Sequence, residues 1–178
     1  MGEKKDLYSE VKGQLNLSER IASFVPGFRG YKEKELRRES DKLIRNHLYV
    51  LLTKDKNDLK IISQKLADRR YLDVMTNMDR LLAKADRISE KINHASYGYT
   101  GFFDAVKVRE ENLDRMIEFD NQLVDGINEF STEIASLKDE LATGETKNLK
   151  TKIDAVTEKV EKIEDIFDRR EGIIIGVT

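Results

Sequence analysis

Twelve apolar residues in the last third of the chain recur at alternating intervals of four and three residues. Spacing that averages 3.5 residues keeps apolar side chains on one narrow stripe of a helix. A short segment containing Gly144 separates two such runs, so the two stripes are predicted to bury each other by folding back as an antiparallel hairpin. The runs are Leu123, Ile127, Phe130, Ile134, Leu137, Leu141 and then Leu149, Ile153, Val156, Val160, Ile163, Phe167.

Similar but less regular patterns predict further helices upstream. The predicted spans are 31–53, 58–93, 103–141 and 147–168. Short connections make successive helices antiparallel, and the two middle spans exceed the outer two by about 20 Å at 1.5 Å per residue. The predicted fold is therefore all-α: an antiparallel up-down four-helix bundle with coiled-coil character and an extended central hairpin. It is predicted to form a single elongated helical domain over 1–178, with its bundle in 31–168.

Breaks in the apolar patterns predict where the helices end. The charged run Lys54–Asp58 is interpreted as a turn, and a bend near Arg70 is the main threat to this layout. The only proline, Pro26, closes an N-terminal amphipathic segment over 1–30. Gly172 is predicted to end the last helix and to leave a β-prone tail over 172–178.

Composition limits where and how such a chain can act. It has no cysteine, which removes disulfides and thiolate metal sites and fits a reducing cytoplasm. The first residues lack the apolar core of a secretory signal, and no apolar stretch approaches the roughly 20 residues of a membrane span. We therefore expect a cytoplasmic protein.

Charge is unevenly distributed between the two parts of the chain. Residues 1–109 hold 23 Lys and Arg against 16 Asp and Glu, whereas residues 110–178 hold 9 against 18. A basic part could meet nucleic acid or an anionic membrane. We favour the alternative, in which the basic part packs beside the acidic part and neutralises it, because blocks of five or more like charges are absent.

A candidate interaction surface is suggested by aromatic and basic residues around two glycine-bearing segments. Seven of the 13 Phe and Tyr residues lie there, and rings beside flexible backbone supply contact area at low entropic cost. The alternative is that the rings plug the open end of the core. A basic helix start could add phosphate contacts, although interleaved acids favour pairing along the helix. The candidate residues are Phe28, Arg29, Tyr31, Arg37, Arg38, Tyr97, Tyr99, Phe102 and Phe103.

The segment Pro26-Gly27-Phe28-Arg29-Gly30-Tyr31-Lys32-Glu33-Lys34-Glu35-Leu36-Arg37-Arg38 resembles N-terminal stretches of uncharacterised prokaryotic helical proteins. The larger region that resembles them, 25–45, covers about an eighth of the chain. The resemblance implies that this loop and helix serve a shared role, without naming an activity.

Catalytic signatures are missing from the sequence. Only His47 and His94 occur, and neither follows a Glu three residues earlier as in di-metal bundles. No phosphate-binding loop, calcium loop or nucleophile elbow is present. We therefore expect a protein without catalytic, cofactor or metal sites: a helical scaffold or protein-interaction module. A peripheral membrane or nucleic-acid binder and an enzyme without a known motif are the alternatives, and a homodimer through the heptad seam or the tail remains open.

Overall fold

The computed structural model describes residues 17–30, 37–95, 110–144 and 147–175. Helices account for 91% of these residues, which contain no strand. A short helix spans residues 17–24, and the longer helices are α2 (Arg37–Asp68), α3 (Met75–His94), α5 (Glu110–Thr143) and α6 (Leu149–Ile175). A 3₁₀ turn, η2 (Leu72–Val74), precedes α3. The all-α prediction is confirmed.

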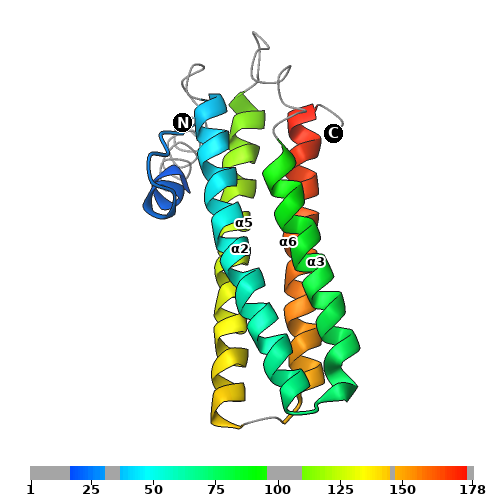
Figure 1. The fold of residues 1–178 in the computed structure, drawn as a ribbon. Coiled ribbons are helices and arrows are strands. Elements are labelled where there is room, and N and C mark those ends of the chain that lie inside the picture. Colours follow the sequence, from blue (N-terminus) through cyan, green and yellow to red (C-terminus); the bar gives the residue numbers. More distant parts are fainter. Residues whose placement is uncertain (1–16, 31–36, 96–109, 145–146, 176–178) are drawn as a thin grey trace, which may run out of the picture.

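The long helices contact one another in a closed ring. Helix α2 packs against α3 and α5, and α6 packs against the same two helices. Successive helices run in opposite directions, so the α2–α3 and α5–α6 connections lie at the same end (Figure 1). The segment 17–30 lies beside the opposite end of α2 and α5.

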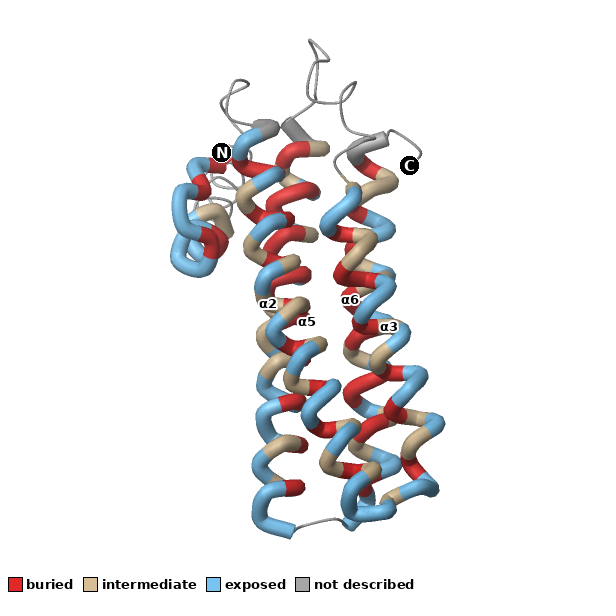
Figure 2. The backbone as a smooth tube through the Cα atoms, viewed as in Figure 1, coloured by how far each residue is buried: buried red, intermediate tan, exposed pale blue. Residues whose placement is uncertain are grey.

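The inward faces of the helices form one continuous apolar core (Figure 2). All twelve residues of the two heptad runs are buried, and their helices α5 and α6 contact each other. Because these stripes alternate by three and four residues, each helix presents a single apolar edge to its neighbours.

The predicted turn at Lys54–Asp58 is wrong, because α2 continues through it to Asp68. The inward positions of α2 follow the same heptad rhythm, and Asp55 occupies one of them between Leu52 and Leu59. Asp55 is only 2% exposed. The charge of Asp55 interrupts the apolar pattern and suggests a solvent-exposed turn, although this carboxylate lies at a core position of a continuous helix.

The turn lies instead at Arg69–Tyr71, where the sequence indicates only a bend. The Tyr71 N–H donates to the Leu66 carbonyl and the Arg70 N–H donates to the Ala67 carbonyl, both at 3.0 Å. This bond pair is the Schellman closure of a helix, with Arg70 in the left-handed region at φ 60°. The turn thus ends α2 after 32 residues, and the helix 58–93 and the extended central hairpin are wrong.

The C-terminal prediction also needs correction. Helix α6 continues past Gly172 to Ile175, so residues 172–175 are helical and do not form a β-prone tail. The side chain of Ile173 is buried in the common core. Core burial outweighs the modest helix propensity of a β-branched residue. Residues 176–178 lie outside the described residues.

Candidate functional site

Residues 17–30 form a strap on the outside of the long helices. Its helix ends at Phe24, before Pro26, which cannot continue a helix, and Gly27 takes φ +85° in the turn that follows. Ile21, Val25 and Phe28 are buried in the common core, whereas Phe24 stays 42% exposed. The strap therefore attaches by one apolar edge.

Polar contacts join the strap to both α2 and α5. Asn121 of α5 donates to the Leu17 carbonyl at 3.2 Å, and Ser40 of α2 donates to the Gly30 carbonyl at 2.9 Å. Arg20 binds both carboxylate oxygens of Asp125 at 2.7 and 3.0 Å. That ion pair is about half exposed on both sides, so solvent screens it and the apolar edge carries most of the docking.

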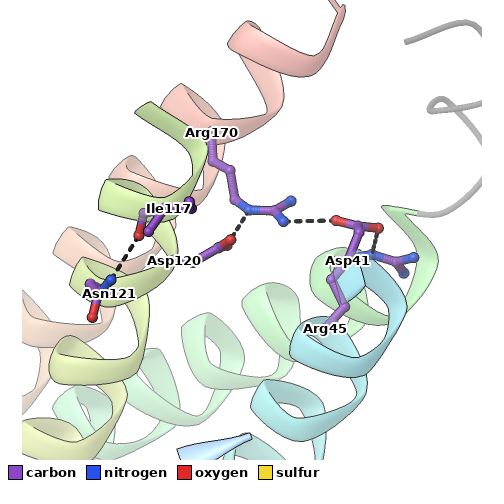
Figure 3. A network of polar contacts seen from close by, with 6 residues as sticks. All are labelled: Asp41, Arg45, Ile117, Asp120, Asn121 and Arg170. Carbon is purple, nitrogen blue, oxygen red and sulfur yellow. Dashed lines mark hydrogen bonds and ion pairs between the residues drawn. The ribbon is translucent and has the colours of Figure 1, made fainter. Parts of the chain in front are cut away.

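Beside the strap lies a buried charge network, defined as Asp41, Arg45, Asp120 and Arg170 (Figure 3). Arg170 of α6 donates to Asp120 of α5 at 2.6 Å and to Asp41 of α2 at 2.7 Å. Arg45 donates to Asp41 at 2.8 Å. All four residues are at most 6% exposed. With two guanidinium groups and two carboxylates the network is neutral, and it ties three helices together.

The strap and the buried charge network are adjacent. Ser40, which holds the Gly30 carbonyl, precedes Asp41, and Asn121, which holds the Leu17 carbonyl, follows Asp120. The Asn121 side chain also donates to the Ile117 carbonyl at 2.9 Å. The two residues that bind backbone carbonyls of the strap are thus each next in sequence to a carboxylate that binds Arg170.

A second buried polar contact lies farther along α2 and α5. The Ser131 hydroxyl donates to the Asp55 carboxylate at 2.6 Å, and nearby Lys138 binds Asp58 at 2.5 Å. Burial raises the pKa of Asp55 above its ordinary 3.8, against the opposing effect of the Ser131 hydrogen bond. The core therefore contains a carboxyl group that is costly to ionise.

Helices α3 and α6 are joined by a ladder of ion pairs, with cations on α3 and carboxylates on α6. Lys84 binds Glu161 at 2.8 Å and lowers the pKa of Glu161 below its usual 4.5 through this hydrogen bond. This pairing supports the interpretation that the basic part of the chain neutralises the acidic part, at least along this face. The other pairs are Arg80–Asp154, Arg87–Glu164, Lys91–Glu164 and Lys91–Asp168.

Two adjoining hollows mark the outer face of α5 and α6. A hollow of about 280 Å³ has Gly126, Ile163 and Ile166 among its lining residues. A Cβ atom on Gly126 would lie 3.2 Å from Ile163, so the glycine allows the helices a close approach. A second hollow of about 600 Å³ reaches Arg20 of the strap. Asp125, Glu129 and Lys159 line both hollows, which together form the α5–α6 groove.

The structure describes the side chains of only two of the predicted interaction residues, Phe28 and Arg29. Phe28 is buried in the core, as the plugging interpretation expects, whereas Arg29 beside it is exposed. Arg37 and Arg38 begin α2, and their side chains are not among those described. The remaining candidates lie outside the described residues: Tyr31, Tyr97, Tyr99, Phe102 and Phe103.

Sequence reasoning missed the buried charge network, although a signal for it existed. Arg170 lies three residues after Phe167, and Asp120 lies three residues before Leu123, so both continue the heptad rhythm at its ends. The apolar runs end there because the next residue in the heptad register is charged at each end. Continuing the register would have placed both side chains in the core.

Comparisons with known proteins add no relative: no protein family, no curated protein and no solved structure matches this chain. Within the described ranges, no helix combines the length and hydropathy of a membrane span. The same residues contain no cluster of three or more His, Cys, Asp or Glu suited to a metal ion.

Proposed function

We propose that this protein is a non-enzymatic helical scaffold or protein-interaction module of the cytoplasm, built as an up-down four-helix bundle with coiled-coil character. The observation that carries the proposal is the α5–α6 groove. It combines apolar lining residues, Ile163 and Ile166, with the charged Asp125, Glu129 and Lys162. An apolar floor with a polar rim is the usual anatomy of a protein-binding surface.

The ladder between α3 and α6 supports the scaffold part of the proposal. Ion pairs at the surface contribute little stability one at a time, but a row of them favours one register of two helices. Helix α6 is thus held from one side by α3 and presents its other side to α5. A rigid backbone under the groove lowers the entropic cost of binding a partner.

Site-specific photocrosslinking in living cells tests this function. Gln122 is exposed and lines the groove, so a benzophenone amino acid in its place reports contacts there. Asp79 is exposed on α3, which is not among the main neighbours of α5, and provides the control position. We expect a discrete adduct from position 122 that disappears when Lys162→Glu is added, and none from position 79. No adduct from position 122, or equal adducts from both, would contradict the proposal.

A further inference from the structure

The strap fills a site that accepts an amphipathic segment. Its buried side chains are Ile21 on the helix, Val25 directly after the helix, and Phe28 beyond the turn at Pro26–Gly27. A short helix that buries apolar anchors in a groove is a recurring mode of peptide binding. All three belong to the common core, and Ser40 of α2 and Asn121 of α5 bind the two ends of the segment. The long helices therefore already bind one short segment on this flank.

The strap has the properties of an element that can leave its site. The described part of its helix has eight residues, and a helix of that length is not stable alone in water. Pro26 cannot continue the strap helix, and Gly27 and Gly30, both at positive φ, follow it in the rest of the strap. The bond between Arg20 and Asp125 is half exposed to water. Elements with few buried contacts are those that open without global unfolding.

The charges of α5 and of the strap are complementary, and they indicate which kind of segment binds best at this site. Helix α5 carries ten acidic residues against two basic ones, whereas the strap carries Arg20 and Arg29 against Glu19. Arg20 stands one position before the first apolar anchor and binds Asp125 of α5. The preferred occupant thus combines an apolar edge with a cation next to it.

We propose that the α2–α5 site beneath the strap is an exchange site, where a partner protein's amphipathic segment displaces the strap. The partner segment carries a branched apolar residue on a short helix, further branched or aromatic apolar residues directly after it, and a cation one position before the first anchor, like Arg20 before Ile21. This inference rests on the proposed interaction function and adds a second surface to it. In the free protein the strap acts as an autoinhibitory occupant.

Displacement of the strap has a consequence inside the molecule. Ser40 and Asn121 lose their partners on the strap, and each adjoins a carboxylate that binds Arg170. Water gains access to the buried charge network, and screened ion pairs hold α6 less tightly than dry ones. Binding at this flank is thereby coupled to the C-terminal end of α6.

A labelled synthetic peptide of residues 17–30 tests the exchange site on the full chain. The variant Ile21→Asp detaches the strap by placing a charge at its first anchor, and fluorescence anisotropy measures peptide binding. We expect the variant to bind at least about tenfold more tightly than the wild-type chain, whose site is occupied. A peptide that itself carries Ile21→Asp is the matched control and should not bind.

A second variant, Arg20→Glu, tests the same proposal without placing a charge in the core. Arg20→Glu in the full chain acts only on an exposed ion pair, and should also increase binding of the native peptide. Asp125→Lys in the Arg20→Glu chain lets the strap pair with α5 again, and should abolish that gain.

Equal binding by the wild-type and Arg20→Glu chains, or by the wild-type chain and an Ile21→Asp chain that keeps its helical circular dichroism, would overturn the exchange site. A wild-type chain that sediments as a dimer and becomes monomeric on Ile21→Asp would overturn it in favour of a second copy. Crosslinks from position 122 that persist while the peptide fails to bind would reject the exchange site alone. Their absence together with peptide binding would reject the α5–α6 groove alone.

Discussion

Single charged residues at core positions define this protein. Asp41, Asp55, Asp120 and Arg170 all lie on the inward edges of their helices, where an apolar residue would stabilise the core more simply. Three of them belong to the buried charge network, and Asp55 binds Ser131. Buried polar contacts of this kind satisfy each other only in one register of the helices. We interpret them as the groups that select this arrangement over alternative pairings of the same heptad stripes.

The buried charge network makes Arg170 the most sensitive charged position. Removing its guanidinium by Arg170→Ala leaves Asp41 and Asp120 buried without their shared cation, and should cost about 3 to 5 kcal/mol of unfolding free energy. The neighbouring Arg169, in an exposed ion pair with Asp165, is the matched control, and Arg169→Ala should cost less than about 0.5 kcal/mol. Urea denaturation measures both. Equal effects of the two substitutions would show that the network contributes no specific stability.

Asp55 should give the stability of the protein a pH dependence of known sign. Because burial raises the pKa of Asp55, the folded protein binds this proton more tightly than the unfolded chain. The contribution of Asp55 is therefore fully present below its ordinary pKa of about 4 and is lost as the pH rises through the raised pKa. Asp55→Asn should gain stability relative to the wild type between pH 4 and pH 7.

Urea denaturation at several pH values measures this difference, and Asp79→Asn, at an exposed position, controls for the loss of a charge. A stability difference between Asp55→Asn and wild type that stays constant from pH 4 to pH 7 would contradict the assignment of Asp55 as a costly buried carboxyl.

At the scale of the elements, the α2–α3 and α5–α6 connections lie at the same end of the molecule but place different residue types in the left-handed conformation. Helix α5 ends at Thr143 and is followed by Gly144 at φ +84°, the residue type that tolerates this conformation best. Helix α2 ends with Arg70 in the same left-handed region, where a side chain is strained. The first turn was predictable from its glycine. The second was not, because no residue near Arg70 carries the usual signal.

This contrast predicts opposite effects at equivalent positions. Arg70→Gly should stabilise the protein by about 0.5 to 1 kcal/mol, because glycine adopts a positive φ without strain. Gly144→Ala should destabilise it by about 1 kcal/mol or more for the converse reason, although no atom would contact the new Cβ within 4 Å. Thermal unfolding followed by circular dichroism measures both changes. A destabilising Arg70→Gly would mean that the arginine side chain stabilises the turn.

Apolar periodicity thus predicts the all-helical class and the pairing of α5 with α6, but it does not predict where the helices end. A pattern of apolar residues records core positions only while those positions stay apolar. It stops at Asp55 and at Arg170 although the helices continue. The partners of these residues lie on other helices, 76 positions away for Asp55 and Ser131, so the neighbouring sequence holds no sign of them. The partners of Arg170 in the buried charge network also lie on other helices, so the sequence around Arg170 does not identify them.

At the scale of the whole molecule, a ring of long helices carries a short strap on one flank. The ring shares one continuous core, and the ion-pair ladder and the buried charge network connect its members across three interfaces. The strap joins that core by three buried side chains and the partly buried Leu17, and has few polar contacts. We therefore expect two cooperative units of unequal stability: the strap and the ring of helices.

Native-state hydrogen exchange on the full chain at increasing denaturant tests this central claim most directly. The Val25 N–H, bonded to the Ile21 carbonyl, reports opening of the strap, and amides around Ile127 and Ile153 report the core of α5 and α6. The account predicts that the strap amide opens at low free energy with little denaturant dependence, while the core amides converge on global unfolding. Exchange of the Val25 amide only through global unfolding would contradict it.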